Sequence, residues 1–358
     1  MKKVLYISAA NEESSIEYRK RSFCSYLSKC SELTVLNLLN DKNSYLIKFL
    51  RKIIDKTSFL PDSYIIYYFF YRKKIKALLK SNKFDYVFIQ TLPFTLLLFC
   101  DLVKKVQPSV KIVVDMSDPI VINAKFKNFG WLKQWELKKI EDRCLAPIDY
   151  LIVLNEEIKN YYATRVKSEI IIIIIEQGTD GISCIKKNEY SLKLRFLYAG
   201  MFYQKLREPY SLYKAVEIFE NKVLLTVCGS FKKKFTPPLK ECVKYLGRVS
   251  KASIQQLYSE TDVIVFIDNN NSYQIPGKIF EVLSSNKAIL FIYFNEDSPT
   301  FKYIDDVEGI FITHNNEEEI KQTIEKIICQ HKNIYSRDIE KYRWENLLKR
   351  LNFLIDLE

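Results

Sequence analysis

Short apolar runs alternate with helical patterns along the whole chain. Most of these runs are nearly continuous in Val, Ile, Leu and aromatic residues. Such runs are typical of strands buried on both faces, as in parallel sheets that helices cover on either side. Twelve strands are predicted, six in each half: Val4–Ser8, Leu33–Leu38, Tyr86–Gln90, Lys111–Asp115, Tyr150–Leu154, Ile170–Ile175, Arg195–Ala199, Leu224–Cys228, Val243–Leu246, Val263–Ile267, Ile289–Ile292 and Gly309–Ile312.

Strands that alternate with helices predict a doubly wound α/β architecture, and six strands in each half predict two such domains. The turn residues of Glu176–Gly181 mark the boundary. We therefore expect an N-terminal domain over residues 1–180 and a C-terminal domain over 181–333. Residues 334–358 are expected to form a terminal helix, because apolar residues recur there at helical spacing: Tyr342, Leu347, Leu348, Leu351, Leu354 and Ile355.

The composition is that of a globular protein with a basic surface. The chain has 358 residues, of which 48% are hydrophobic and 27% charged, and its net charge is +12. This balance favours anionic partners: nucleic acid, an anionic lipid surface or phosphorylated small molecules. An A+T-rich genome would also enrich lysine, so the charge alone does not choose among them. No helix-turn-helix, zinc-finger or RNA-binding aromatic motif supports nucleic acid.

We expect a cytoplasmic protein. The eight cysteines form no Cys-x-x-Cys or Cys/His cluster, and several lie in apolar runs, as expected of reduced core residues. The opening Met1–Ile7 segment is too short for a signal-peptide core. No run reaches the roughly 18 apolar residues that span a bilayer.

Ligands of open parallel sheets bind beyond the carboxyl ends of the strands. One such end is Ala199-Gly200, followed by Lys205, Arg207 and then Pro209, which suits a first helical position. Cations just before a helix start form a plausible phosphate site, although they are equally compatible with solvated loop residues. A second strand ends at Gly229, which allows either close approach to a ligand or a simple turn.

The most informative segment is Ser272–Leu283, after the Val263–Ile267 strand. Pro276 can open a helix there, and Gly277 would let a phosphate approach the free amides. Glu281 follows one turn later on the same face as Gly277, where it could accept hydrogen bonds from ribose hydroxyls. The ordinary alternative is an exposed helix glutamate.

Taken together, these residues resemble the family-4-like glycosyltransferases of the GT-B fold, of the bacterial surface-polysaccharide type. The C-terminal domains of that family share a set of motifs in a fixed order along the sequence. A strand ending in Ala-Gly is followed by a basic residue and a helix, then by a strand ending in Gly and a Leu-Gly-x-Val segment. A Pro-x-Lys-x-x-Glu helix and a late Tyr-Ser-Trp-Glu helix come after these. The matching residues in the C-terminal half are Ala199-Gly200, Arg207-Glu208-Pro209, Gly229, Leu246-Gly247-Arg248-Val249, Pro276-Gly277-Lys278-Ile279-Phe280-Glu281, Asn286-Lys287-Ala288-Ile289 and Tyr342-Arg343-Trp344-Glu345.

The N-terminal half resembles the same family, with some departures. Matches are Phe84–Phe94, Val114–Pro119 and Gln177–Asp180, which resemble the family's strand-and-loop, aspartate-loop and Asn-Gly-x-Asp segments. Many members carry a second glutamate eight positions before Glu281, where this chain has Tyr273. The usual arginine of the aspartate loop is Ser117, and the glycine-rich loop is replaced by Ser8–Glu12. These departures bear on the sugar and acceptor contacts.

The resemblance implies two facing Rossmann-like domains and a final helix that crosses back to the N-terminal one. It also implies a hexosyltransferase-like, retaining enzyme that takes a UDP- or GDP-type sugar donor, without metal or other cofactor. The nucleotide-sugar would be bound in the C-terminal domain and the acceptor in the N-terminal one. The implied donor-binding residues are Gly200, Lys205, Arg207, Gly229, Arg248, Pro276, Gly277, Lys278 and Glu281, with Asp118, Arg207 and Glu281 implied in catalysis.

Asp115 and Asp118 end a strand of the N-terminal domain, so we expect them to face the cleft. Asp118 either orients the acceptor or sugar, acts as a base if the reaction inverts, or is only a turn residue before Pro119. Asp115 better suits a structural cap. His314 and His331 are the only histidines, and no metal-ligand cluster is visible.

A basic, aromatic segment from Lys48 to Lys80 could rest on anionic lipid, or could be ordinary helix packing with solvated lysines. If it binds membrane, a polyprenyl-linked saccharide acceptor would follow; otherwise a free saccharide serves. The other functions considered are a sugar-nucleotide epimerase or hydrolase of the same fold, and a non-catalytic nucleotide- or polyanion-binding protein. Scarcity of histidine disfavours the epimerase.

Overall fold

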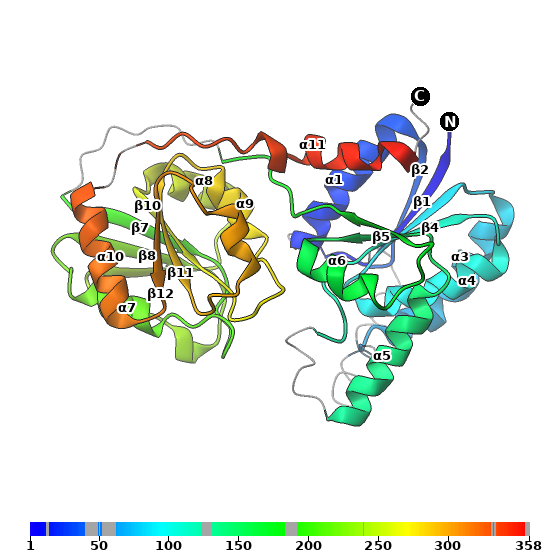
Figure 1. The fold of residues 1–358 in the computed structure, drawn as a ribbon, viewed down its shortest axis with the longest axis horizontal. Helices are drawn as coiled ribbons and strands as arrows, with labels where there is room; N and C mark the ends of the chain where they lie inside the picture. Colours follow the sequence, from blue (N-terminus) through cyan, green and yellow to red (C-terminus); the bar gives the residue numbers. More distant parts are fainter. Residues whose placement is uncertain are drawn as a thin grey trace. The chain divides into compact units, whose positions relative to one another are not determined.

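A computed structural model describes residues 1–11, 14–39, 49, 51, 62–122, 130–182, 192–238, 240–330, 332 and 334–354. The chain divides into two compact units (Figure 1). The N-terminal unit comprises Met1–Glu176 and Trp344–Glu358, and the C-terminal unit comprises Gln177–Arg343. Among the described residues, no helix is both long enough and apolar enough to cross a bilayer.

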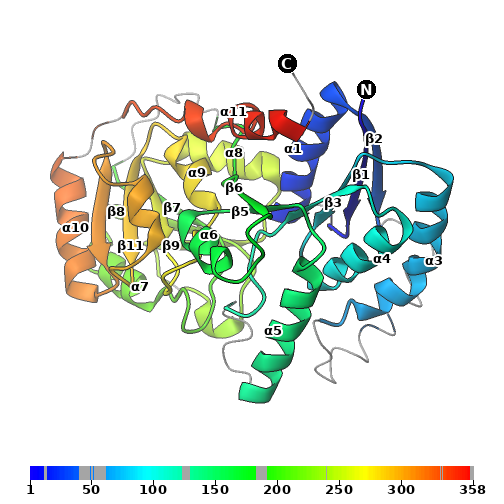
Figure 2. The same ribbon diagram turned by 45° about the vertical axis from the view of Figure 1, so that its right-hand side comes forward.

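The N-terminal unit is built on a parallel six-stranded sheet in the order β2-β1-β3-β4-β5-β6. All five side chains of β3 are buried, as expected for a strand covered on both faces. Helices α3, α4 and α5 lie on one face, while α1 and α11 run alongside each other on the opposite face (Figures 1 and 2). The strands are β1 (Lys3–Ser8), β2 (Glu32–Asn37), β3 (Tyr86–Gln90), β4 (Lys111–Asp115), β5 (Tyr150–Val153) and β6 (Ile171–Ile174).

Helix α1 shows why these helices form where they do. Ser14 caps its start by accepting a hydrogen bond from the Glu17 amide, and buried Phe23 and Leu27 lie one turn apart on its inner face. The helices of this unit are α1 (Ser15–Cys30), α3 (Ile65–Ser81), α4 (Phe99–Val106), α5 (Trp131–Leu145), α6 (Glu156–Ala163) and α11 (Trp344–Leu348), with 3₁₀ turns η1 (Phe94–Leu98) and η5 (Lys349–Leu354).

The C-terminal unit repeats the architecture with strand order β12-β11-β10-β7-β8-β9, again fully parallel. Strands β7 to β9 extend the sheet in one direction, and β10 to β12 extend it in the other. The direction therefore reverses between β7 and β10, which are neighbours. The strands are β7 (Leu194–Ala199), β8 (Val223–Cys228), β9 (Val243–Gly247), β10 (Val263–Ile267), β11 (Ala288–Tyr293) and β12 (Ile310–His314).

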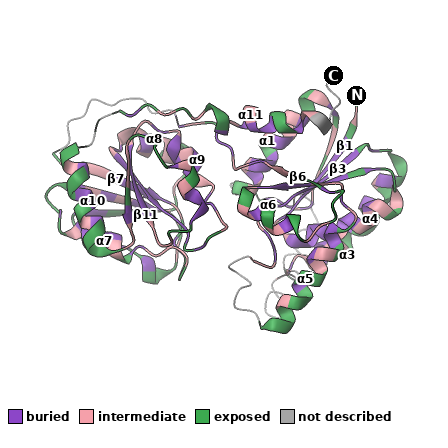
Figure 3. Cartoon of the chain, in the orientation of Figure 1, coloured by how far each residue is buried: buried purple, intermediate pink, exposed green. Residues whose placement is uncertain are grey.

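Helices cover both faces of this second sheet, with α7 and α10 side by side on one face and α8 and α9 on the other. Apolar residues fill the layers between helices and sheet in both units, and Figure 3 shows the buried strands at their centres. The helices are α7 (Tyr210–Glu217), α8 (Lys251–Glu260), α9 (Lys278–Leu283) and α10 (Glu317–Gln330), with 3₁₀ turns η2 (Lys233–Phe235), η3 (Pro299–Tyr303) and η4 (Glu340–Tyr342).

All twelve predicted strands are present, and each end lies within two residues of its prediction. The expected α/β class is confirmed. The prediction of a terminal helix from residue 334 is wrong in its extent. Residues 334–339 are not helical, and α11 begins only at Trp344. Arg337 instead ties this stretch to the C-terminal unit by donating to the carbonyls of Ser285 (2.7 Å) and Lys287 (2.8 Å). Ile355 lies outside the described residues.

The unit boundaries fall at Glu176/Gln177 and Arg343/Trp344, whereas the sequence placed them after residues 180 and 333. The cause is that the two connecting segments pair with each other. Thr179 donates its amide to the Tyr342 carbonyl at 3.0 Å and bridges to Arg343. Both segments therefore belong to the C-terminal unit. Beyond them, Trp344 packs edge-on against Tyr18 and Phe23 of α1.

Candidate functional site

A pocket lies at the point where the strand order of the C-terminal sheet reverses. Its empty space is about 300 Å³ when the open solvent at its mouth is counted with it. Ligands of doubly wound sheets bind at such switch points. The described residues that line it include two cations and no acid: Tyr198, Ala199, Gly200, Arg207, Tyr258, Ile264, Val265, Phe266, Ile267, Lys278 and Val282.

A tight turn after β7 positions Arg207. Tyr203 and Arg207 exchange two backbone hydrogen bonds of 2.9 and 2.8 Å, with Lys205 at the turn in a left-handed conformation (φ 62°). The Lys205 amide donates to the Glu208 carboxylate at 2.8 Å. The Asn270 amide donates to the Leu206 carbonyl at 2.8 Å, which joins the turn to the loop after β10. Both neighbouring strand ends thus hold the turn in place.

The guanidinium of Arg207 is only partly satisfied by protein groups. Its Nη2 donates to the Asn269 side-chain oxygen at 2.6 Å, whereas its Nε is buried without a hydrogen-bond partner among the described residues. A buried donor without a partner loses its hydration without compensation. Arginine remains charged at any physiological pH. The pocket therefore contains a cation whose Nε–H group has no hydrogen-bond acceptor among the described residues.

Asp268 holds Asn269 in position through a hydrogen bond from the Asn269 amide. This fully buried carboxylate accepts hydrogen bonds from the Asn269 amide (2.8 Å), Ser298 Oγ (2.5 Å) and Thr300 Oγ1 (3.0 Å). Burial raises its pKa, and these hydrogen bonds partly offset the rise. Asp268 and Asn269 directly follow an apolar strand in the sequence, a signal that the sequence reasoning missed.

Lys278, the first residue of α9, brings the second positive charge to the pocket. Burial lowers the pKa of its ammonium group, Glu281 raises it, and Arg207 lowers it further. Its Nζ lies 5.7 Å from the centre of the Tyr258 ring. An anion bound between Arg207 and Lys278 would relieve both the desolvation and the mutual repulsion of the two cations.

The structure brings together three of the residues predicted to bind the donor: Gly200, Arg207 and Lys278. The other predicted residues do not line this pocket. Lys205 and Arg248 are exposed on loops, Pro276 is buried just before α9, and Glu281 is half-buried one turn into it.

Two glycines have steric roles within the protein itself. A Cβ at Gly229, whose φ is 151°, would lie 1.9 Å from the Gly200 carbonyl oxygen. A Cβ at Gly277 would lie 2.7 Å from Cγ of Gln177. The close approaches that these glycines permit are therefore between protein segments, so neither glycine by itself indicates a ligand.

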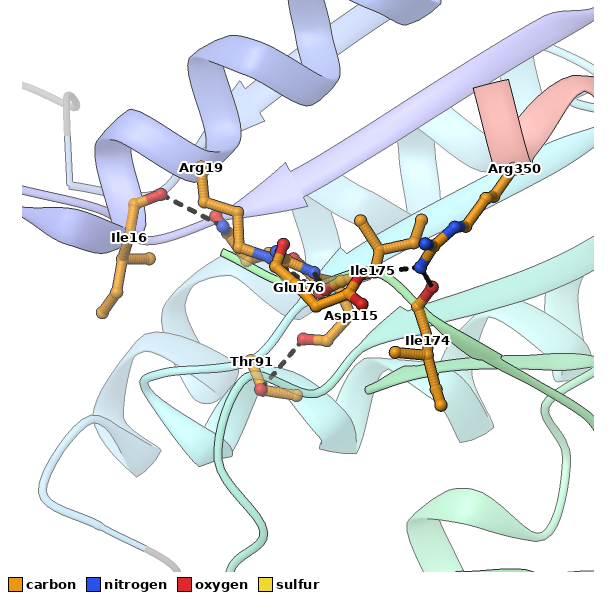
Figure 4. Close-up of polar contacts among 9 residues, drawn as sticks. Ile16, Arg19, Thr91, Asp115, Ile174, Ile175, Glu176 and Arg350 are labelled. Atoms are coloured by element: carbon orange, nitrogen blue, oxygen red, sulfur yellow. Dashed lines mark hydrogen bonds and ion pairs between the residues drawn. The ribbon is translucent and has the colours of Figure 1, made fainter. Parts of the chain in front are cut away.

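Asp115 is not exposed at its strand end, contrary to the expectation from its position there, but has a structural role, as its sequence context favoured. It is buried at the end of β4, where both its oxygens accept hydrogen bonds of 2.8–3.0 Å from Arg19 of α1 (Figure 4). Arg19 also donates to the carbonyls of Ile175 and Glu176, so the pair anchors the end of the N-terminal unit. Asp118 lies in the following loop and is half-buried.

The sequence contains a local signal for the buried position of Arg19. Arg19, Phe23 and Leu27 recur every four residues on the buried side of α1. A cation in such an apolar stripe requires a buried carboxylate partner. Arg350 adds a further connection by donating to the Ile174 carbonyl and the Glu176 carboxylate, each at 2.6 Å.

No family model and no curated protein matches the sequence. Solved structures match its fold over the whole length. Sucrose-phosphate synthase from Thermosynechococcus elongatus gives a TM-score of 0.70 at 12% identity, covering 99% of this chain and 98% of that one. The Anabaena protein HepE, in complex with UDP, gives 0.66 at 10% identity, covering 98% of each chain.

A glycosyltransferase from Rickettsia africae gives a TM-score of 0.60 at 15% identity, covering 99% of this chain and 96% of that one. UDP-N-acetylglucosamine 2-epimerases share the fold as well. The chain therefore has the GT-B fold, as expected. At these identities the likeness establishes the fold alone.

The buried Arg19–Asp115 pair gives a test of stability. Arg19→Met leaves a buried carboxylate unpaired and should lower the free energy of unfolding by about 3–5 kcal/mol. Arg19→Met/Asp115→Leu removes both charges and should cost less than the single change. All three tryptophans belong to the N-terminal unit, so tryptophan fluorescence during denaturant unfolding reports on that unit.

Arg21→Met on the same helix is the matched control. Its side chain is 67% exposed and pairs with Glu17, so the change should stay within about 0.5 kcal/mol. An Arg19→Met protein as stable as the Arg21→Met control would show that the pair does not anchor the unit.

Proposed function

We propose that this protein is a glycosyltransferase that moves a sugar from a nucleotide-diphosphate sugar to an acceptor. The observation that carries the proposal is the two-cation pocket at the switch point of a GT-B fold. A diphosphate would bring negative charge into a pocket whose described lining holds Arg207 and Lys278 but no acid, and it could accept a hydrogen bond from Arg207 Nε. UDP in the HepE structure supports a UDP-type donor.

The proposed chemistry follows from where charge develops. The bond between the anomeric carbon and the diphosphate oxygen breaks, an acceptor oxygen forms the new bond, and its proton passes to the leaving phosphate. Arg207 and Lys278 stabilise the negative charge on that phosphate. Because these cations can serve the purpose, we propose a metal-independent reaction, and the family resemblance favours retention of anomeric configuration.

We assign the donor to the C-terminal unit and the acceptor to the N-terminal unit. The proposed acceptor is a saccharide carried on a lipid, as in surface-polysaccharide synthesis. Asp118 is proposed to orient the acceptor or the sugar, and Glu281 to bind the ribose hydroxyls from α9. Lys205 and Arg248 lie on exposed loops, where they would add charge near the nucleotide.

An epimerase is the second candidate, because UDP-N-acetylglucosamine 2-epimerases share the fold. An epimerase changes the sugar of its nucleotide-sugar without any acceptor, whereas a transferase hydrolyses the donor only slowly when the acceptor is absent. NMR of a panel of nucleotide-sugars incubated with the protein distinguishes the two. Appearance of an epimeric nucleotide-sugar would replace the transferase proposal.

Arg207→Ala should weaken binding of both UDP and inorganic pyrophosphate about tenfold or more, since a hydrogen bond to a charged group contributes roughly 1.5–3 kcal/mol. Glu281→Ala should weaken UDP to a similar extent but leave pyrophosphate unchanged, because its proposed partner is the ribose. Calorimetric titration measures both affinities. Turnover should fall roughly 100-fold in Arg207→Ala, as when an oxyanion donor is lost.

Lys244→Ala removes an exposed charge from β9 of the same unit and serves as the control. It should bind UDP like the unaltered protein. Equal UDP affinity in Arg207→Ala and Lys244→Ala would refute the pocket, and a loss of pyrophosphate binding in Glu281→Ala would refute the ribose assignment.

Chelation of divalent cations should leave transfer activity intact. The reason is that arginine and lysine, not a metal ion, are proposed to neutralise the departing diphosphate. The measurement is initial rate after dialysis against EDTA, compared with the same sample after Mg²⁺ or Mn²⁺ is restored. Activity that vanishes on chelation and returns with metal would contradict the proposed mechanism.

A further inference from the structure

Helix α5 of the N-terminal unit carries an apolar patch on its outer side. Its inner side is buried through Leu137, Cys144 and Leu145. At 100° per residue, Leu132 and Trp135 lie on the opposite side, and Trp131 lies beside them at the helix start. These three side chains, here called the α5 patch, are 77% (Trp131), 57% (Leu132) and 51% (Trp135) exposed.

This exposure is unusual because large apolar side chains normally avoid water unless a partner covers them. Two of the three tryptophans in the chain lie in this single turn of helix. In both ribbon views the first turn of α5 lies farther from the sheet of its own unit than the last turn does (Figures 1 and 2). Figure 3 shows this end of the helix as mostly exposed. The three side chains of the patch are therefore exposed to solvent.

Cations surround the α5 patch. Lys133, Lys138 and Lys139 are exposed on the same helix, against one exposed acid, Glu136, over these turns. The Lys139 ammonium lies 3.5 Å from the centre of the Trp135 ring. Tryptophan flanked by lysine is characteristic of the interface between lipid headgroups and acyl chains, where the ring is buried and the ammonium contacts phosphate.

Helix α3 of the same helix layer repeats this combination. Phe69 and Phe70 are 57% and 46% exposed and are followed by exposed Arg72, Lys73 and Lys74. Both α3 and α5 pack against η1 and α4. Of the basic segment predicted from Lys48 to Lys80, the part before Asp62 lies outside the described residues except for Phe49 and Arg51, and Phe49 is also exposed.

We propose that the α5 patch docks the protein on the surface of an anionic lipid bilayer. Trp131, Leu132 and Trp135 enter the headgroup region, and the neighbouring lysines contact lipid phosphates. Charge complementarity favours this occupant over a second copy of the chain, because the surrounding surface is basic and the whole chain carries +12. The proposal does not depend on the donor pocket, which lies in the other unit.

Tryptophan fluorescence tests the proposal directly. Trp344 is 5% exposed in the core, so Trp344→Phe leaves Trp131 and Trp135 as the only indoles. With vesicles of phosphatidylglycerol and phosphatidylcholine, their emission should shift to the blue and be quenched by brominated acyl chains. Trp131→Ser/Leu132→Ser/Trp135→Ser in the otherwise unaltered protein should lower vesicle partitioning about tenfold or more, measured by flotation.

Ile218→Ser is the matched control, because Ile218 is 52% exposed at the end of α7 in the other unit. It should float like the unaltered protein, and UDP binding of the triple variant should be unchanged. Lys138→Glu/Lys139→Glu should weaken binding to phosphatidylglycerol vesicles, and high salt should do the same.

Three results would overturn the proposal. The first is flotation of the triple variant equal to that of the Ile218→Ser control. The second is binding to vesicles of pure phosphatidylcholine that is as strong as binding to the phosphatidylglycerol vesicles, which would show that anionic lipid is not required. The third is a dimer of the unaltered protein that the triple variant dissociates without lipid, which would make a second copy the occupant.

Discussion

Two positive charges share one half-enclosed pocket in the C-terminal unit, and no acid is found among the described residues that line it. Taking a cation out of water is costly unless a counter-charge accompanies it. The cost is visible in Lys278, because burial lowers the pKa of its ammonium group. Arg207 has a buried Nε without a hydrogen-bond partner among the described residues. A bound diphosphate would supply a counter-charge to both side chains. In the proposed reaction the same two cations stabilise the negative charge that develops on the leaving diphosphate.

The backbone topology determines where this pocket can form. Connections leave β7 and β10 toward opposite ends of the sheet, so their neighbouring carboxyl ends stay uncovered by a crossover. The Tyr203–Arg207 turn follows one strand, and Asp268-Asn269 follows the other. The buried Asp268 fixes Asn269, and Asn269 fixes Arg207. In the N-terminal unit the strand order reverses between β1 and β3. The carboxyl end of β4, next to β3, carries Asp115, whose ion pair with Arg19 holds the fold together.

Much of the fold could be predicted because strands buried on both faces have continuous apolar sequences, as in Val263–Ile267. Arg207 could be proposed for the site because it stands just before a helix start, whereas Lys278 was implied only by the family resemblance. The Arg19–Asp115 pair spans 96 residues of sequence, and Gly229 and Gly277 are required by segments that meet only in space. Residues 334–339 are not helical although apolar spacing predicts a helix there. Contacts to distant residues hold the segment instead, through Arg337 and through the pairing of Tyr342 and Arg343 with Thr179. Local sequence does not identify the partner in such a long-range contact, although the position of Arg19 in the buried stripe of α1 indicates that it needs one.

The most direct measurement is a crystal structure of the protein with UDP bound. The account predicts the diphosphate in the pocket between β7 and β10, with Arg207 Nε donating to one phosphate oxygen and Lys278 Nζ to another. UDP bound at another surface, with the Arg207 guanidinium and the Lys278 ammonium still without a phosphate, would contradict the account at its centre.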